Sequence, residues 1–308
     1  MSQVATMDWA PEKLKTLDRA PSDGEIIKAK ELIDVISPMG LSLQARKVYN
    51  LLLENAHTRM GERGGEHQIP LSVLRGVHKG NERLDRVLKQ LMTTVAVIQL
   101  HGEKGRRGIR RVQLLGGNDV VEDVNEREGV FKYEFDPRLV DVLLESRVYA
   151  QLKKDVVFAF ESKYALALYE VVQRRSNLRH LAHEEIDIGK LRALLDVEPE
   201  KYATFGALNQ RVLKPAVTEV NFLCDFSVSM EPIKTGRKIT AVRLSWWMKS
   251  ADDKRRAREE LRRARIGRKA RRDDAVEELA DFRQKLRADI EHAGKPPAIP
   301  DLEDEIVY

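Results

Sequence analysis

Residues 204–221 of the chain read TFGALNQRVLKPAVTEVN, and residues 222–246 continue as FLCDFSVSMEPIKTGRKITAVRLSW. In the first stretch, apolar residues recur with the 3.6-residue period of a helix. In the second, two strand-like segments flank the short basic turn KTGRK. The sequence therefore predicts a helix followed by a β-hairpin, an order that is typical of a winged helix.

A helical wheel divides residues 204–221 into two sides. The apolar side gathers Phe205, Leu208, Val212, Leu213, Ala216 and Val220, and the polar side gathers Ala207, Gln210, Arg211, Lys214, Thr218 and Asn221. Pro215 removes one backbone donor and frees the Arg211 carbonyl, so we expect one helix with a kink. Asn209 falls on the apolar side, which predicts either a buried amide with partners or a helix that begins later.

The polar side of this helix suits the major groove of DNA. Glutamine pairs bidentately with adenine, and arginine pairs bidentately with guanine. Lysine, threonine and asparagine can contact either phosphates or base edges. The turn that follows presents further donors, which favours DNA reading over a merely solvated face. The candidate contacts in this region are Gln210, Arg211, Lys214, Thr218, Lys234, Arg237 and Lys238.

An earlier part of the chain has a similar order of elements. The pattern predicts helices over residues 25–36, 43–57 (capped by Ser42), 72–77 (capped by Ser72), 81–92 and 137–145, and extended segments over 67–71, 93–100, 111–115 and 130–135. Basic residues lie on the polar face of the 81–92 helix and in the following glycine-bearing turn. We interpret Arg83, Arg86, Lys89, Arg106 and Arg107 as phosphate or minor-groove contacts, with a protein interface or plain solvation as the alternative.

The second half repeats this plan and leads into residues 204–246. It predicts a strand over 156–160, a helix over 163–175 capped by Ser162, an extended segment at 186–188 and a short helix over 190–195. We therefore predict an α+β, mainly helical fold with two tandem winged helices and a charged C-terminal helix. The predicted parts are a flexible arm (1–24), the two winged-helix domains (25–147 and 148–248) and a helical extension with an acidic tail (249–308).

The extension has an uneven charge. Residues 249–272 hold 12 Lys/Arg against 4 Asp/Glu, and residues 273–308 hold 4 against 11. The basic block is too uniform to read bases, but it could add affinity for DNA through counterion release. A solvated helix or a protein-docking helix is the alternative. Apolar residues from Val276 to Ile290 predict a helical stripe, and we expect the sequence from Gly294 to Pro297 to end the helix.

Composition and motifs argue against several classes of function. In 308 residues there is no apolar run near 18 residues and no secretory pattern at the N-terminus. The single Cys224 fits a small apolar residue in a reducing cytosol. Neither HExxH nor a P-loop pattern occurs, and His180, His183, Glu184 and Glu185 are a poor metal set. We therefore expect no enzyme activity, metal or cofactor.

Several motifs resemble a known family. FGALNQRVLKPAVTEVN followed by DFSVSMEPIKTGRKITAVRLSW resembles the second winged helix of the iteron-binding plasmid replication initiators. FESKYALALYEVVQRR is similar to the helix that opens the same domain, and LSLQARKVYNLLLENA to a helix of the first winged helix. The resemblance covers about residues 25–247, and it is more specific in the second domain than in the first.

The resemblance implies a bacterial, cytoplasmic, plasmid-associated protein. Such proteins bind direct repeats in double-stranded origin DNA as monomers, help melt an AT-rich segment, and recruit the host initiator and replicative helicase. As dimers joined through the first domain, many repress their own gene, which contributes to copy control. By motif position, Arg211, Lys214, Arg237 and Lys238 would contact DNA.

Two alternatives remain at this stage. A winged-helix transcription regulator without a replication role would carry the same motifs. An enzyme such as a primase or nicking enzyme is less well supported, because the sequence offers no carboxylate cluster or tyrosine motif.

Overall fold

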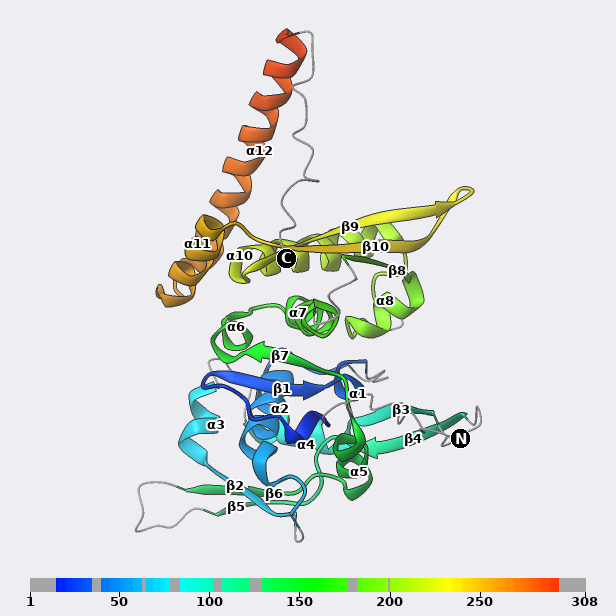
Figure 1. Ribbon diagram of the computed structural model, residues 1–308, viewed down its shortest axis with the longest axis vertical. Helices are drawn as coiled ribbons and strands as arrows, with labels where there is room; N and C mark the ends of the chain where they lie inside the picture. The colour runs from blue at the N-terminus through cyan, green and yellow to red at the C-terminus, as the bar shows by residue number, and fades with distance from the viewer. Residues whose placement is uncertain are drawn as a thin grey trace, which may run out of the picture. The chain divides into compact units, whose positions relative to one another are not determined.

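The computed structural model (Figure 1) describes residues 15–34, 40–62, 65–77, 84–101, 107–121, 129–176, 182–198 and 200–293. The chain divides into two compact units, Met1–Arg262 and Arg263–Tyr308. The first unit contains two hydrophobic cores, one for each predicted winged helix. The predicted α+β, mainly helical fold is confirmed.

The first core is built by the predicted helix–strand–helix–helix–hairpin order. Its elements are α2 (Leu43–Ala56), β2 (His67–Pro70), α3 (Leu71–Val77), α4 (Leu84–Thr93), β3 (Val95–His101) and β4 (Arg107–Gln113). Ser42 caps α2 as predicted, since its hydroxyl accepts from the Ala45 N–H at 3.1 Å. Ser72 is not a cap, because α3 already begins at Leu71.

Two further strands and a helix complete this domain. They are β5 (Asn118–Val121), β6 (Val130–Tyr133) and α5 (Pro137–Glu145), of which only β5 was not predicted from the sequence. The strands β2, β6 and β5 form one antiparallel sheet, and β3 and β4 form a separate two-stranded ribbon. Pro137 opens α5 as predicted, with Asp136 as its cap.

Two predicted elements have the wrong type. Residues 25–36 were predicted as a helix, but β1 (Glu25–Ala29) is a strand that pairs antiparallel with β7 (Tyr149–Lys153), and only α1 (Lys30–Ile33) is helical. Residues 156–160 were predicted as a strand, but they fall in and just after the helix α6 (Lys154–Ala159). Both are short apolar runs, and periodicity alone does not separate a buried strand from a buried helix at such lengths.

Part of the predicted N-terminal arm is ordered against the first domain. A 3₁₀ turn (η1, Thr16–Asp18) buries Thr16, whose N–H donates to the Ser146 carbonyl. His57 Nε2 lies 2.7 Å from the Arg19 carbonyl oxygen. Residues 1–14 of the predicted arm lie outside the described residues.

The second core is built around one central helix, α7 (Lys163–Ser176). The other elements are β8 (His183–Asp187), α8 (Ile188–Leu194), α9 (Phe205–Leu208), a π-helical turn (Asn209–Leu213), α10 (Lys214–Leu223), β9 (Phe226–Thr235) and β10 (Lys238–Met248). The three strands form an antiparallel sheet in the order β8-β10-β9. Ser162 caps α7 as predicted, because its Oγ accepts from the Tyr164 and Ala165 N–H groups.

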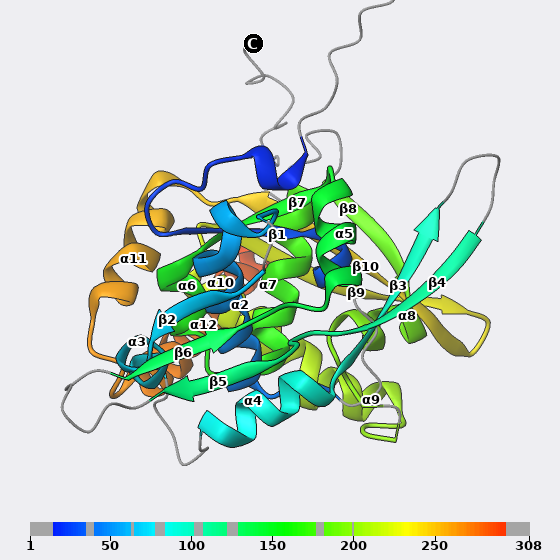
Figure 2. The same ribbon diagram turned by 90° about the horizontal axis from the view of Figure 1, so that it is seen from below.

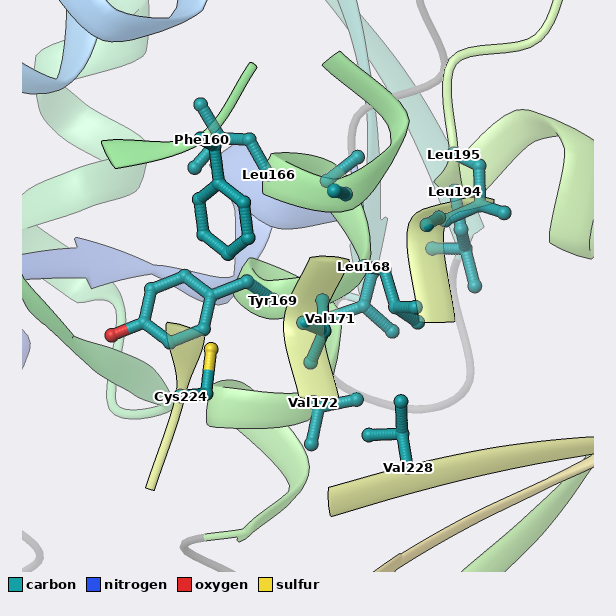
Figure 3. Packing of buried hydrophobic residues seen from close by; sticks show 14 of the residues in the cluster. Phe160, Leu166, Leu168, Tyr169, Val171, Val172, Leu194, Leu195, Cys224 and Val228 are labelled. Atoms are coloured by element: carbon teal, nitrogen blue, oxygen red, sulfur yellow. The ribbon is translucent and has the colours of Figure 1, made fainter. Parts of the chain in front are cut away.

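Apolar side chains from all these elements surround α7. Figure 3 shows part of this core, with Phe160, Tyr169 and Cys224 close together. The Tyr169 ring lies 5.5 Å from Phe160 and 6.0 Å from Phe226, measured between centroids. Cys224 packs into this core, where burial raises the pKa of its thiol well above the ordinary value. This placement agrees with the predicted role of a small apolar residue.

After β10 the chain forms two helices instead of the single long helix that was predicted. These are α11 (Ala251–Arg262), in the first unit, and α12 (Arg268–Ala293), in the second. Gly267, with φ of +80°, separates them. In α12 the side chain of Val276 is exposed, and residues 294–308 lie outside the described part. None of the described helices is long and apolar enough to cross a membrane.

Candidate nucleic-acid interface

A continuous helix, the reading helix, runs from α9 through the π-helical turn to α10. Thr204 caps it by accepting from the Ala207 N–H at 3.2 Å. In the π-helical turn the Lys214 N–H donates to the Asn209 carbonyl, five residues earlier. A proline ring clashes with the carbonyl four residues before it, and a wider turn at this point relieves that clash. The predicted irregularity at Pro215 is therefore present as a π segment.

The two sides of the reading helix follow the predicted wheel. Five of the six predicted apolar residues are buried, and Phe205 is half-buried. On the other side Gln210, Arg211 and Lys214 are exposed, and Thr218 is half-exposed. Asn209, whose placement was open, is half-buried at the start of the π-helical turn.

One residue of the predicted polar side has a structural role instead. The Asn221 amide donates through Nδ2 to the Val228 carbonyl (3.0 Å) and accepts through Oδ1 from the Val228 N–H (2.7 Å). These bonds fasten the end of the helix to β9. The wheel places Asn221 on the polar side correctly, but it does not show that a strand of the same domain binds this side chain.

A buried carboxylate on the same helix was not anticipated from the sequence. Glu219 accepts from the Glu161 N–H (2.6 Å) and the Ser162 N–H (3.2 Å), immediately before the first turn of α7. A carboxylate is favourable at a helix N-terminus, where several N–H groups lack partners within the helix. The only sequence feature that indicated this buried carboxylate was a glutamate within the apolar period of residues 212–220.

The β9–β10 hairpin carries the second group of candidate contacts. Its two-residue turn contains Gly236, with φ of +62°, a conformation that favours glycine. Lys234, Arg237 and Lys238 are exposed at this tip. In Figure 1 the hairpin extends beyond the helices that pack against it, so its tip stands in solvent.

The cations of the reading helix and the hairpin tip are available to an outside partner. Within the described residues, the side chains of Arg211, Lys214, Lys234, Arg237 and Lys238 form no hydrogen bond or ion pair. Other cations of the domain are engaged, since Lys153, Lys163, Arg175 and Arg243 each pair with a carboxylate. Two neighbouring elements therefore present uncompensated positive charge.

The candidate contacts of the first domain are only partly described. Arg86 and Lys89 are exposed on α4, and Lys89 pairs with Asp85 at 3.1 Å. Arg83 and Arg106 lie outside the described residues, and of Arg107 only the backbone, at the start of β4, is described. Arg110 is occupied, since it donates to the Arg138 carbonyl at 2.9 Å. In both views the β3–β4 ribbon and the β9–β10 hairpin project from the same side of the first unit (Figures 1 and 2).

The described residues offer no metal centre. They contain no group of three or more His, Cys, Asp and Glu side chains that could hold a metal ion. Glu184, one of the candidates near His183, forms ion pairs with Arg175 and Lys190. The carboxylate of Glu184 is thus occupied by ion pairs within the domain. His180 lies outside the described residues.

Two helix-and-hairpin modules, each with exposed cations on its third helix, define a protein with two winged helices built to contact DNA. Residues 25–173 match the family described as initiator replication protein, WH1, and residues 187–246 match initiator Rep protein, WH2. The chain belongs to this family of initiator replication proteins, which are DNA-binding and non-enzymatic. The resemblance stated from the sequence is confirmed.

One solved structure has a similar fold. The Pi initiator protein in complex with iteron DNA has 17% sequence identity and a TM-score of 0.53, covering 75% of this chain and 100% of that chain. Two structures of RctB domains 2 and 3 have identities of 9% and 10% and TM-scores of 0.37 and 0.34. They cover 71% and 73% of this chain and 81% and 83% of those chains. Among curated proteins, none matches the chain.

Proposed function

We propose that this protein initiates plasmid replication by binding direct repeats, or iterons, in double-stranded DNA at the origin. The observation that carries the proposal is the exposed row Gln210, Arg211 and Lys214 beside a hairpin tip with three further cations, all without partners among the described residues. Family membership supports the role in replication, and the likeness to the iteron-bound Pi initiator supports the kind of DNA.

The reading helix recognises sequence in the major groove. The Arg211 guanidinium donates two hydrogen bonds to guanine, and the Gln210 amide pairs with adenine. Lys214 and Thr218 bind phosphates, as do Lys234, Arg237 and Lys238 at the hairpin tip. Gln210 and Arg211 therefore provide sequence specificity, whereas the phosphate-binding residues provide affinity and fix the position of the protein on the duplex.

The first domain supplies a second contact through α4 and the β3–β4 ribbon. Arg83, Arg86 and Lys89 on the helix and Arg106 and Arg107 at the ribbon tip bind phosphates or enter the minor groove. With one helical turn of the duplex for each domain, one protein molecule would cover about twenty base pairs.

The free energy of binding to the repeats drives opening of the origin. Bending or unstacking the duplex costs a few kcal/mol, which the contacts of two domains offset. The melted segment then receives the host initiator and the replicative helicase. A dimer joined through the first domain represses the protein's own gene at an inverted repeat, and the monomer–dimer balance thereby contributes to copy control.

Footprinting of the purified protein on the DNA that flanks its own gene tests this function. The expected result is regularly spaced protection over direct repeats of about twenty base pairs next to an AT-rich tract. Protection of a single palindrome over the promoter, with no repeats, would instead indicate a transcription regulator. Metal-dependent nicking or primer synthesis would contradict the proposal.

A further inference from the structure

Polar groups connect α4, the third helix of the first domain, to the segment that precedes the reading helix of the second. The Gln90 side chain on α4 donates through Nε2 to the Gly40 carbonyl (3.0 Å) and accepts through Oε1 from the Ser42 N–H (3.3 Å). Between these two residues, the Leu41 N–H donates to the Asp196 carboxylate. A single short segment, residues 40–42, therefore lies between α4 and Asp196.

Asp196 belongs to a tightly held connection between α8 and the reading helix. Asp196 and Tyr202 have φ of +58° and +53°, which is uncommon for residues other than glycine and most unusual for a bulky side chain. Arg192 holds the same connection by donating to the carbonyl groups of Tyr202 and Glu198, both at 3.0 Å. Such backbone conformations persist only where the surroundings enforce them.

Buried ion pairs hold Asp196, and with it this connection, in place. Arg46 on α2 pairs with Asp196 (3.4 Å) and with Glu170 on α7 (2.8 Å). Glu170 is fully buried and also accepts from Lys28 (2.8 Å) and from the Asn50 amide (2.9 Å). Removing one member of such a network leaves an uncompensated charge, so the network resists rearrangement.

A close approach at Gly40 adds a second link. Gly40 has φ of +60°, and a Cβ at this position would lie 3.0 Å from Oε1 of Glu198 and 3.2 Å from Nζ of Lys163. Lys163 and Glu198 form an ion pair at 3.0 Å. The segment at 40–42 is thus packed directly against the same connection that Asp196 begins.

We infer that this interdomain bridge (Gln90, residues 40–42, Arg46, Glu170 and Asp196) sets the spacing between the two DNA sub-sites that the protein accepts within one repeat. The inference rests on the proposed function and concerns residues that touch no DNA. One added base pair moves the second sub-site by about 3.4 Å and rotates it by roughly 35°. With a rigid bridge, the second domain cannot move to follow the displaced sub-site. With a loosened bridge, it can.

The test uses the full-length chain and duplexes that carry one footprinted repeat, either unaltered or with one base pair inserted between the two sub-sites. For the wild-type protein we expect the insertion to weaken binding by about tenfold or more, the size of a typical mismatch penalty. The double variant Gln90→Ala/Asp196→Asn should reduce this penalty to about threefold or less, since asparagine keeps the left-handed backbone but not the charge. Gln68→Ala/Asp252→Asn, which makes the same chemical changes at exposed positions, should keep the wild-type penalty.

The possible outcomes separate the bridge from the proposed function. An insertion penalty in the double variant equal to that of the wild type overturns the inference while leaving iteron binding intact. A wild-type protein that tolerates the insertion overturns it as well. Failure of the wild type to prefer the repeat over scrambled DNA overturns the proposed function itself. Should the double variant not fold by circular dichroism, the neutral change Gln90→Ala alone decides the question by the same comparison.

Discussion

At the residue scale, the reading helix divides its polar side chains between solvent and the protein interior. Arg211 and Lys214 point outward without partners among the described residues, whereas Glu219 and Asn221 bind backbone groups of neighbouring elements. All four are polar residues within eleven positions of one helix. Only the first two are therefore suited to DNA, and substitution of the others is expected to act on folding.

Arg211→Ala tests the reading role directly. We expect a loss of roughly 1–3 kcal/mol in binding to the repeat and a relaxed preference at one base pair, because a bidentate contact to guanine disappears. Competition with a set of single-base variants of the repeat measures both effects. Arg59→Ala is the matched control, since Arg59 is exposed and pairs with Glu62. An equal loss on scrambled DNA would mean that Arg211 holds only a phosphate.

Glu170→Gln tests the buried charges of the interdomain bridge. Burial by itself would raise the pKa of Glu170, but the charges of Lys28 and Arg46 and the hydrogen bonds from Lys28 and Asn50 outweigh it and lower the pKa. Burial lowers the pKa of Lys28 in spite of this pairing, so the carboxylate is the better compensated partner. The variant should lose about 3–5 kcal/mol of unfolding free energy, because Lys28 and Arg46 keep their charges without it.

The pH dependence of this loss has a definite sign. Since the pKa of Glu170 is lower in the folded state than in the unfolded state, its stabilisation is complete above the ordinary value of 4.5 and disappears as the pH falls through the lowered value. Urea unfolding at several pH values should therefore show a gap between wild type and variant that narrows only in acid. The control Glu62→Gln alters an exposed ion pair and should change little. A gap that is constant down to the lowest pH would contradict the assignment.

At the element scale, the long amphipathic elements were predictable because their side chains meet one buried side. The helix α4 and the β9–β10 hairpin follow a clear period of apolar residues. The helices α2 and α7 are buried on nearly all sides, and their length and serine caps made them predictable. The strand β1 has no clear period, because four of its five residues are buried, including Lys28. Its type depends on pairing with β7, which lies more than a hundred residues away, and a local pattern contains no such information.

The β9–β10 hairpin tip is predicted to act through phosphate contacts. The triple variant Lys234→Ala/Arg237→Ala/Lys238→Ala should weaken binding to specific and scrambled DNA alike. It should also reduce the slope of log K against log salt by roughly 0.9 for each phosphate contact removed. The double variant Arg59→Ala/Arg243→Ala, which removes two exposed but paired cations, serves as the control. An unchanged salt slope in the triple variant would exclude the tip from the DNA interface.

At the scale of the whole molecule, the two winged helices share elements that their sequence order does not reveal. The strand pair β1–β7 and the helix α7 contribute to the second core, although β1 lies at the start of the first domain. The first family match likewise extends to residue 173, inside α7. Two modules were predictable from the repeated order of elements, but the network that joins them required long-range pairing of single polar residues.

The boundary of the C-terminal extension gives a final prediction about two truncations. The helix α11 belongs to the first unit, where it buries Ala257 and Glu260 and packs with α6 and α10. Just before it, Nζ of Lys249 donates to the Asn221 (2.5 Å) and Cys224 (2.7 Å) carbonyls and thereby caps α10. A chain that ends at residue 262 should therefore keep the wild-type unfolding midpoint, whereas one that ends at residue 248 should unfold earlier.

The same two chains separate stability from DNA affinity. Residues 263–272 contribute basic side chains to the region after α11, so the chain that ends at residue 262 should bind the repeat specifically but with a shallower salt dependence than the full chain. Thermal unfolding and binding titrations at several salt concentrations measure the two quantities independently. If the shorter chain, ending at residue 248, were as stable as the full chain, α11 would be an appendage and not part of the second domain. If the salt slope of the chain ending at 262 equalled that of the full chain, the basic segment after α11 would make no contact with phosphates.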